Sequence, residues 1–251
     1  MMTKAPLSKT QYGIYVESVN HQGENCYNLP YLYILDGSLD GNRLCRAVEA
    51  AVAAHPTLFT RIELDEEGNP LQVVDDSETF TLTVEETADL DVDNCQQDLI
   101  APFNLYSDRL FRIRLLKDTK HYYLFIDYHH LIVDGTSMQV MLKDIDAAYA
   151  GKTLEPEAMT QIDVVKAEQE HLESPAFEED KRWYAQNFDC GDTYTQLMPD
   201  LEIQEHAEAA LLRTLDTSME RVDAFCQANG IFRSSLFTMA YAFLLAKFNN
   251  E

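Results

Sequence analysis

The sequence predicts a mixed α/β fold, an α+β sandwich in which helices pack on sheets. Two sequence patterns predict this fold. In some segments apolar residues recur at every second position, as in a strand, and in others they recur with the period of a helix. The two kinds of segment follow one another in an irregular order, without an internal repeat. The 251 residues are 46% hydrophobic and 10% aromatic, which suffices for a sizeable core and excludes the composition of a disordered chain. This length fits one or two compact lobes.

The N-terminal part predicts two helices, each followed by strands, and then a third helix. Ser8 is the expected cap of the first helix. The second has one apolar face and ends before Pro56, which cannot continue it. The helices are expected at residues 8–20, 40–55 and near 91–103, and strands at 28–36, 58–64, 70–76 and 80–86, with a turn at 67–69.

Two stronger strands follow, at residues 110–116 and 121–130, joined by a short polar turn. The next helix, 136–151, is amphipathic, and four of its side chains are expected to face inward: Val140, Met141, Ile145 and Ala148. A charged helical stretch at 167–188 is interrupted near Ser174–Pro175.

Beyond it we expect a strand at 209–216 and two more helices. The helix at 217–230 has a capping-box pattern, Thr217 with Glu220, and ends at Gly230. The helix at 234–248 is apolar almost all round but too short for a membrane span, which favours burial inside protein.

Charge and cysteine content narrow the possible partners. There are 43 acidic and 19 basic residues, a formal net charge of -24, and such a surface repels nucleic acid and anionic membranes. The five cysteines form no CxxC pair, so neither a disulfide framework nor a zinc site is indicated. The N-terminal residues contain no apolar signal core, so we expect a cytoplasmic protein.

The segment YHHLIVDGTS, residues 128–137, is the candidate site. Successive side chains of a strand point to opposite faces, so His129 and His130 cannot both enter one site by the same route. One is expected to be structural and the other a reagent. Gly135 allows either a turn with positive φ or close approach of a ligand, and Thr136–Ser137 can cap the following helix.

A histidine beside a helix N-terminus offers a general base and donors for an oxyanion, as acyl transfer requires. A purely structural histidine is the commoner role at such a position. The sequence supports a metal site at His130 and Asp134 even less, since no third ligand lies at a usual interval.

At these residues the sequence resembles the condensation domains of nonribosomal peptide synthetases, which share the chloramphenicol acetyltransferase fold and have an HHxxxDG signature. Three further segments resemble family motifs in the family's order: residues 6–18, with Ser8, Gln11 and Tyr15 at matching places, residues 55–62, and residues 161–188. The resemblance implies an acetyltransferase-like lobe at 1–172, followed at 173–251 by connecting helices and the beginning of a second, incomplete lobe.

The resemblance also implies the residue roles. His130, the second histidine of the signature, is the catalytic residue, and His129 is structural. Asp134 holds the loop by an ion pair, with Arg61 as its expected partner and Arg112 or Arg114 as alternatives. Gly135 leaves room for a phosphopantetheine arm, which would belong to a donor or acceptor carrier protein, while the domain itself binds no cofactor or metal. An adenylation domain is the expected neighbour.

Several alternatives stay open within this resemblance. The signature also occurs in acyltransferases that form esters and in epimerization domains, and the chain can also be a non-catalytic scaffold or docking piece. The chain stops about where the family's second lobe begins, so we expect it to be inactive alone. We also expect it to hide the helix at 234–248 by self-association or by folding it back.

Overall fold

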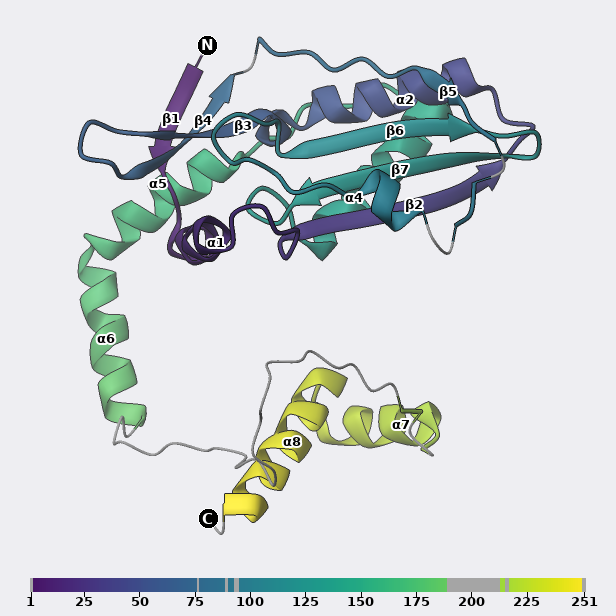
Figure 1. Ribbon diagram of the computed structural model, residues 1–251. Helices are drawn as coiled ribbons and strands as arrows, with labels where there is room; N and C mark the ends of the chain where they lie inside the picture. The colour runs from purple at the N-terminus through teal and green to yellow at the C-terminus, as the bar shows by residue number, and fades with distance from the viewer. Residues whose placement is uncertain are drawn as a thin grey trace, which may run out of the picture. The chain divides into compact units, whose positions relative to one another are not determined.

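The computed structural model describes residues 2–75, 77–88, 90–92, 95–188, 213–214 and 217–249. The chain divides into two compact units, residues 1–178 and 179–251. The first unit holds two sheets with their covering helices, and strands and helices follow one another in an irregular order, as the sequence predicts (Figure 1). The predicted α/β class is therefore confirmed.

The larger sheet has four strands in the order β2-β7-β6-β5. They are β2 (Asn28–Asp36), β7 (His121–His129), β6 (Phe111–Lys117) and β5 (Val84–Glu86), and all pairs are antiparallel except β5 with β6. Every residue of β7 after His121 is buried. A central strand covered on both faces has to be apolar on both, which explains the nearly continuous apolar run of β7.

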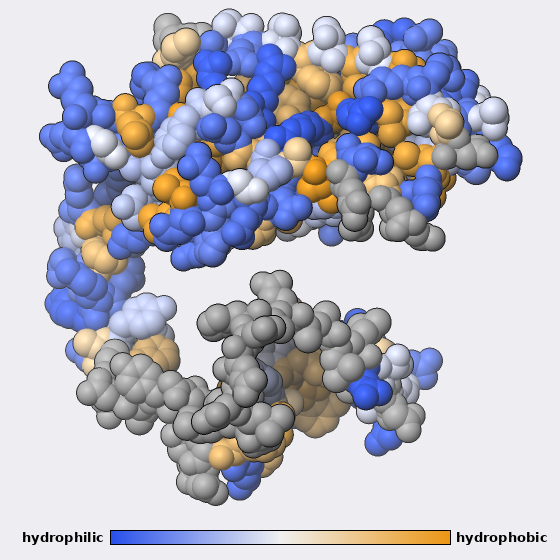
Figure 2. Space-filling model, viewed as in Figure 1, coloured by the Kyte–Doolittle hydropathy of each residue, from blue (hydrophilic) through white to orange (hydrophobic). Residues whose placement is uncertain are grey.

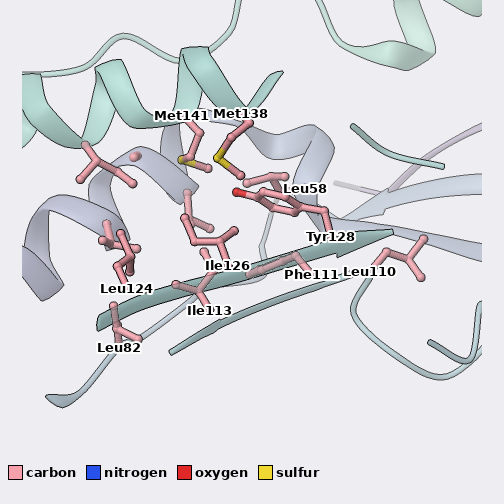
Figure 3. Packing of buried hydrophobic residues seen from close by; sticks show 14 of the residues in the cluster. Leu58, Leu82, Leu110, Phe111, Ile113, Leu124, Ile126, Tyr128, Met138 and Met141 are labelled. Atoms are coloured by element: carbon pink, nitrogen blue, oxygen red, sulfur yellow. The ribbon is translucent and has the colours of Figure 1, made fainter. Parts of the chain in front are cut away.

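One face of β7 forms the main core together with α2 (Gly41–Ala54) and α4 (Gly135–Tyr149). Figure 3 shows Leu124, Ile126 and Tyr128 of the sheet beneath Met138 and Met141 of α4. The opposite face packs Tyr123 and Phe125 against Leu99 of the short helix α3 (Gln96–Leu99). The two opposite faces expected for this strand are therefore confirmed.

The smaller sheet has three antiparallel strands in the order β1-β4-β3. They are β1 (Met2–Pro6), β4 (Pro70–Asp75) and β3 (Thr60–Leu64), and a 3-10 turn, η1 (Pro56–Phe59), precedes β3. Helix α1 (Lys9–Asn20) follows β1 and begins at the predicted cap, Ser8. Helix α5 (Gln161–Leu172) packs on this sheet through a small apolar cluster formed by Ala5, Val74, Ile162 and Val165.

The second unit contains the helices α7 (Met219–Asn229) and α8 (Arg233–Asn249), and α6 (Pro175–Asn187) crosses the division between the units. Gly230 ends α7 with φ 63°, as predicted. The predicted capping box is wrong, because the cap is Ser218 and not Thr217. Among the described helices none alone is long and apolar enough to cross a membrane, although the bent pair α7–α8 meets that criterion when taken together.

Other sequence expectations need correction. Val140 is 43% exposed, and Met138 takes the inward position on α4. Only Val84–Glu86 of the strand expected at 80–86 pairs, and α3 is a single turn. The strand expected at 209–216 lies almost wholly outside the described residues. In the view of Figure 2 the surface of the first unit is largely hydrophilic, consistent with the net charge of -24.

Candidate active site

The loop after β7 begins between the two histidines. His129 is the last residue of the strand, and its N–H donates to the carbonyl of Leu110. The N–H of His130 donates to the carbonyl of Tyr27 at 2.9 Å, while that of Ile132 turns back to the carbonyl of His129 at 3.2 Å. The chain therefore changes direction at His130, and the two imidazoles enter different surroundings.

His129 is a buried, neutral support of this loop. It is 4% exposed, and its Nδ1 accepts the N–H of Leu131 at 3.1 Å. Since Nδ1 accepts, the proton of the neutral ring belongs on Nε2, which lies 3.3 Å from the hydroxyl of Ser18. Burial, with the nearby His130, lowers the pKa of His129 to about 4. At neutral pH the ring carries no charge.

His130 is half-buried and has the opposite arrangement of ring nitrogens. Its Nδ1 lies 2.9 Å from the carbonyl of Val133, which can only accept, so Nδ1 carries the proton. Within the described part of the chain no hydrogen bond occupies Nε2, whose lone pair can accept a proton. The side chain lines a pocket of about 240 Å³, together with Ser8, Gln11 and Ser137. An imidazole whose Nε2 is unoccupied beside a pocket is suited to general base catalysis.

The loop ends at Asp134, which is the N-cap of α4. Its Oδ1 accepts the N–H and the hydroxyl of Ser137, both at 2.8 Å, and its own N–H donates back to the Ser137 hydroxyl. The backbone and side-chain hydrogen bonds from Ser137 lower the pKa of Asp134. The helix is thus capped by Asp134, whereas the sequence analysis expected Thr136 and Ser137 to cap it.

Gly135 is the first residue of α4 and has no positive φ, so the turn expectation is wrong. A Cβ built on Gly135 would meet no atom within 4 Å, so the space beside it is open. This openness fits the other expectation, close approach of a ligand to the backbone.

The arginines expected to pair with Asp134 bind other carboxylates. Arg61 lies 2.5 Å from Glu78, Arg114 lies 2.6 Å from Glu85, and Arg112 lies 3.4 Å from the buried Asp127. Asp134 is exposed, so no buried charge has to be compensated there. The expected ion pair with Arg61 is therefore absent from this structure, and Arg61 instead holds β3 to the segment after β4.

A second, larger pocket of about 390 Å³ lies beside the same loop and shares Ile132, Val133 and Ser137 with the first. Tyr128 lines it, 2% exposed, and its hydroxyl has no hydrogen-bond partner among the described residues. Sequence reasoning missed this hydroxyl, because the pattern of β7 identifies Tyr128 only as a core residue.

His55 also lines the larger pocket and was not singled out in the sequence. It is the C-cap of α2, and its ring nitrogens lie 2.8 Å from Asp144 and 3.4 Å from Glu157. Hydrogen bonds from the ring to these carboxylates, Glu157 first, raise the pKa of His55. In the described ranges no group of three or more His, Cys, Asp or Glu side chains is arranged to hold a metal ion.

Comparison with known proteins decides the family. The sequence matches the condensation domain family over residues 1–251. The chain belongs to the condensation domain family. Relatives with similar sequences include surfactin synthase subunit 2 of Bacillus subtilis (strain 168), 27% identical over 97% of this chain and 7% of that protein. Tyrocidine synthase 3 of Brevibacillus parabrevis is 30% identical over 73% of this chain and 3% of that protein.

Solved condensation domains share the fold. The condensation domain of the monacolin K polyketide synthase MokA matches with a TM-score of 0.80 at 18% identity, over 99% of this chain and 60% of that one. The first condensation domain of the CDA synthetase matches with a TM-score of 0.68 at 19% identity, over 99% of this chain and 63% of that one. The chain thus spans less than two thirds of these condensation domains, and a small share of the synthases.

Proposed function

We propose that this condensation domain takes part in nonribosomal peptide synthesis and forms peptide bonds between carrier-bound thioesters. The observation that carries the proposal is the arrangement of His130. Its Nδ1–H is engaged by the carbonyl of Val133, and this leaves the basic Nε2 at a pocket beside the loop. The family match and the synthase relatives support the same reaction class.

In the proposed step the acceptor's amine attacks the carbonyl carbon of the donor thioester. The new C–N bond forms, the C–S bond breaks, and the donor's thiol leaves. His130 Nε2 accepts the proton that the amine nitrogen loses and returns it to the departing sulfur, so that the imidazole is neutral again after each turnover. His129 fixes the loop from its buried side, Asp134 caps α4, and Gly135 leaves the space in which a phosphopantetheine arm would lie.

The partners and location follow from the same proposal. Donor and acceptor carrier proteins would deliver their substrates on phosphopantetheine arms, with an adenylation domain as a neighbour. The domain would bind no cofactor of its own. We place the acetyltransferase-like lobe at residues 1–172 and the incomplete second lobe at 173–251. Among the described cysteines, Cys26, Cys45 and Cys226 are free thiols, which fits the proposed cytoplasmic location.

A carrier-loaded assay tests the function. The full-length protein is mixed with a donor carrier that bears an aminoacyl thioester and an acceptor carrier that bears a second one, and both carriers are weighed by mass spectrometry. We expect the donor's acyl group to appear on the acceptor carrier as a base-stable amide. An ester product, or inversion of a residue without transfer, would instead establish one of the alternative acyltransferase or epimerization activities. No transfer by a folded protein across several loaded pairs would favour a scaffold.

A further inference from the structure

Gln11 reaches across from α1 to the loop that carries His130. Gln11 is 5% exposed, and its Nε2 donates to the carbonyl of Leu131 at 3.2 Å. Leu131 is the residue next to His130, and its N–H is already bound by Nδ1 of His129. The backbone N–H and the backbone carbonyl of Leu131 are thus both held by side chains, the first by His129 of β7 and the second by Gln11 of α1.

Gln72 of β4 holds the amide of Gln11 in place. It is fully buried at 0% exposed, and its Nε2 donates to Oε1 of Gln11 at 3.2 Å and to the carbonyl of Pro6 at 2.9 Å. The amide of Gln11 lies 3.4 Å from Oε1 of Gln72 in return. Such a reciprocal pair leaves each amide one orientation, because a flipped amide would face donor to donor.

The capping of α1 fixes the same side chain a second time. Oε1 of Gln11 accepts the N–H of Ser8 at 3.0 Å, while the Ser8 hydroxyl accepts the N–H of Gln11 at 3.1 Å. The capping box needs only the oxygen of Gln11, so its NH₂ group remains for Leu131. A glutamate would serve equally well at this position as a cap. An amide is required here because the carbonyl of Leu131 in the loop needs a donor.

We propose that Gln11, backed by Gln72, is a positioning residue that sets the placement of His130. This inference rests on the proposed function of His130. The buried amide pair anchors the loop to the smaller sheet, so that Nε2 of His130 is held at one place for the attacking amine. Loss of the anchor lowers kcat more than it changes KM, because it displaces the base and leaves the carriers' binding surfaces intact.

The test is Gln11→Glu in the full-length protein, since glutamate keeps the cap and removes the NH₂ group that donates to Leu131 and faces Oε1 of Gln72. The matched control is Gln169→Glu, which makes the same change at an exposed residue of α5 that lines neither pocket. We expect Gln11→Glu to lower kcat by about 10- to 100-fold at pH 8, with KM for the loaded carriers unchanged. Gln169→Glu should stay near wild type.

Lowering the pH supplies a rescue. A protonated glutamic acid can donate to the Leu131 carbonyl, so the activity of Gln11→Glu relative to wild type should rise as the pH falls. Gln11→Met removes the donor without adding charge and should give a pH-independent deficit. In the His130→Ala background Gln11→Glu should cause no further loss, since a positioning residue acts only through the residue it positions.

The inference fails if folded Gln11→Glu and Gln11→Met keep the wild-type kcat. It also fails if Gln11→Glu lowers kcat by the same factor in the wild-type and the His130→Ala backgrounds. Failure of the proposed function looks different, because His130→Ala would then itself be active. If both Gln11 variants unfold, Gln72→Met is measured, since it removes the backing amide and leaves the α1 cap intact. A wild-type kcat in that variant would also overturn the inference.

Discussion

His129 and His130 are neighbours in the chain, yet their rings donate through opposite nitrogens. His129 accepts through Nδ1 from the loop it supports, and His130 donates through Nδ1 to the carbonyl of Val133. Strand geometry alone predicted unequal roles for the pair. Strand geometry could not show that β7 ends at His129. That end depends on the carbonyls of Leu110 and Tyr27, which lie in other segments and accept the N–H groups of His129 and His130.

The neutral state of His129 makes stability depend on pH. Its pKa falls from 6.5 to about 4 on folding, so protons bind the unfolded chain more tightly. The stabilisation is present above pH ~6.5 and is lost as the pH falls toward 4, by roughly 3 kcal/mol in total. Urea unfolding at pH 7 and pH 4.5 measures it, with His129→Gln as the comparison. If His129→Gln loses stability between these pH values as steeply as wild type, His129 is not buried and neutral.

Asp134 makes a smaller contribution than a buried ion pair would. Because it is an exposed N-cap, Asp134→Ala should cost about 1 kcal/mol, and Asp134→Asn, which still caps, should cost much less. Thermal or urea unfolding of the two variants measures both. A cost of ~3–5 kcal/mol for Asp134→Ala would contradict the structure and restore the buried ion pair expected from the sequence.

At the scale of elements, His55 joins three segments of the first unit. Its ring lies between Asp144 of α4 and Glu157, which precedes α5, and Glu157 also accepts the N–H of Thr57 at 2.9 Å. Because both ring nitrogens face carboxylates, the imidazolium is the favoured form. His55 therefore ties the end of α2 to α4 and to the chain that leads into α5.

The contacts of His55 with Asp144 and Glu157 predict a pH dependence of stability that is opposite to that of His129. The pKa of His55 is raised in the folded state, so its stabilisation is present below pH ~6.5 and is lost as the pH rises through the raised value. His55→Gln should cost about 1–3 kcal/mol at pH 6 and progressively less at higher pH. Urea unfolding across this range gives the difference. A cost that is constant or grows with pH would show that the ring is neutral.

The elements themselves were largely predictable, whereas their connections were not. Period-two alternation predicted β6, and an apolar stripe predicted α2, because burial on one face imposes these patterns. The same logic failed at Val140, since a helical period does not fix the rotation of α4 to within one residue. Partners such as Arg61 with Glu78, or Gln11 with Gln72, join residues far apart in the sequence, and local pattern contains no signal for them.

At the scale of the whole molecule, α8 presents large apolar side chains to solvent. Its most exposed residues are Met239, Tyr241, Phe243, Leu244 and Phe248, each at least 50% exposed. Apolar patches larger than a few hundred Å² are uncommon on monomeric proteins. A helix with this surface therefore needs a cover, which the described residues of its own unit do not provide.

We expect the 251-residue chain, expressed as such, to self-associate through α8. Light scattering should give a mass above the 28.7 kDa of one chain. The double variant Met239→Lys, Phe243→Lys should shift the distribution toward the monomer, and Trp183→Lys on α6 tests whether another exposed aromatic has the same effect. A strictly monomeric wild-type chain at high concentration would contradict this expectation.

The central claim is that His130 is the base of a condensation reaction, and the rate of product formation by His130→Ala tests it most directly. In the full-length protein, with loaded donor and acceptor carriers, we expect this variant to fold like wild type and to lose about 10²–10⁴-fold in rate. His129→Ala, its matched neighbour, should instead lower stability, because the N–H of Leu131 loses its acceptor. Product formation by folded His130→Ala at the wild-type rate would contradict the account.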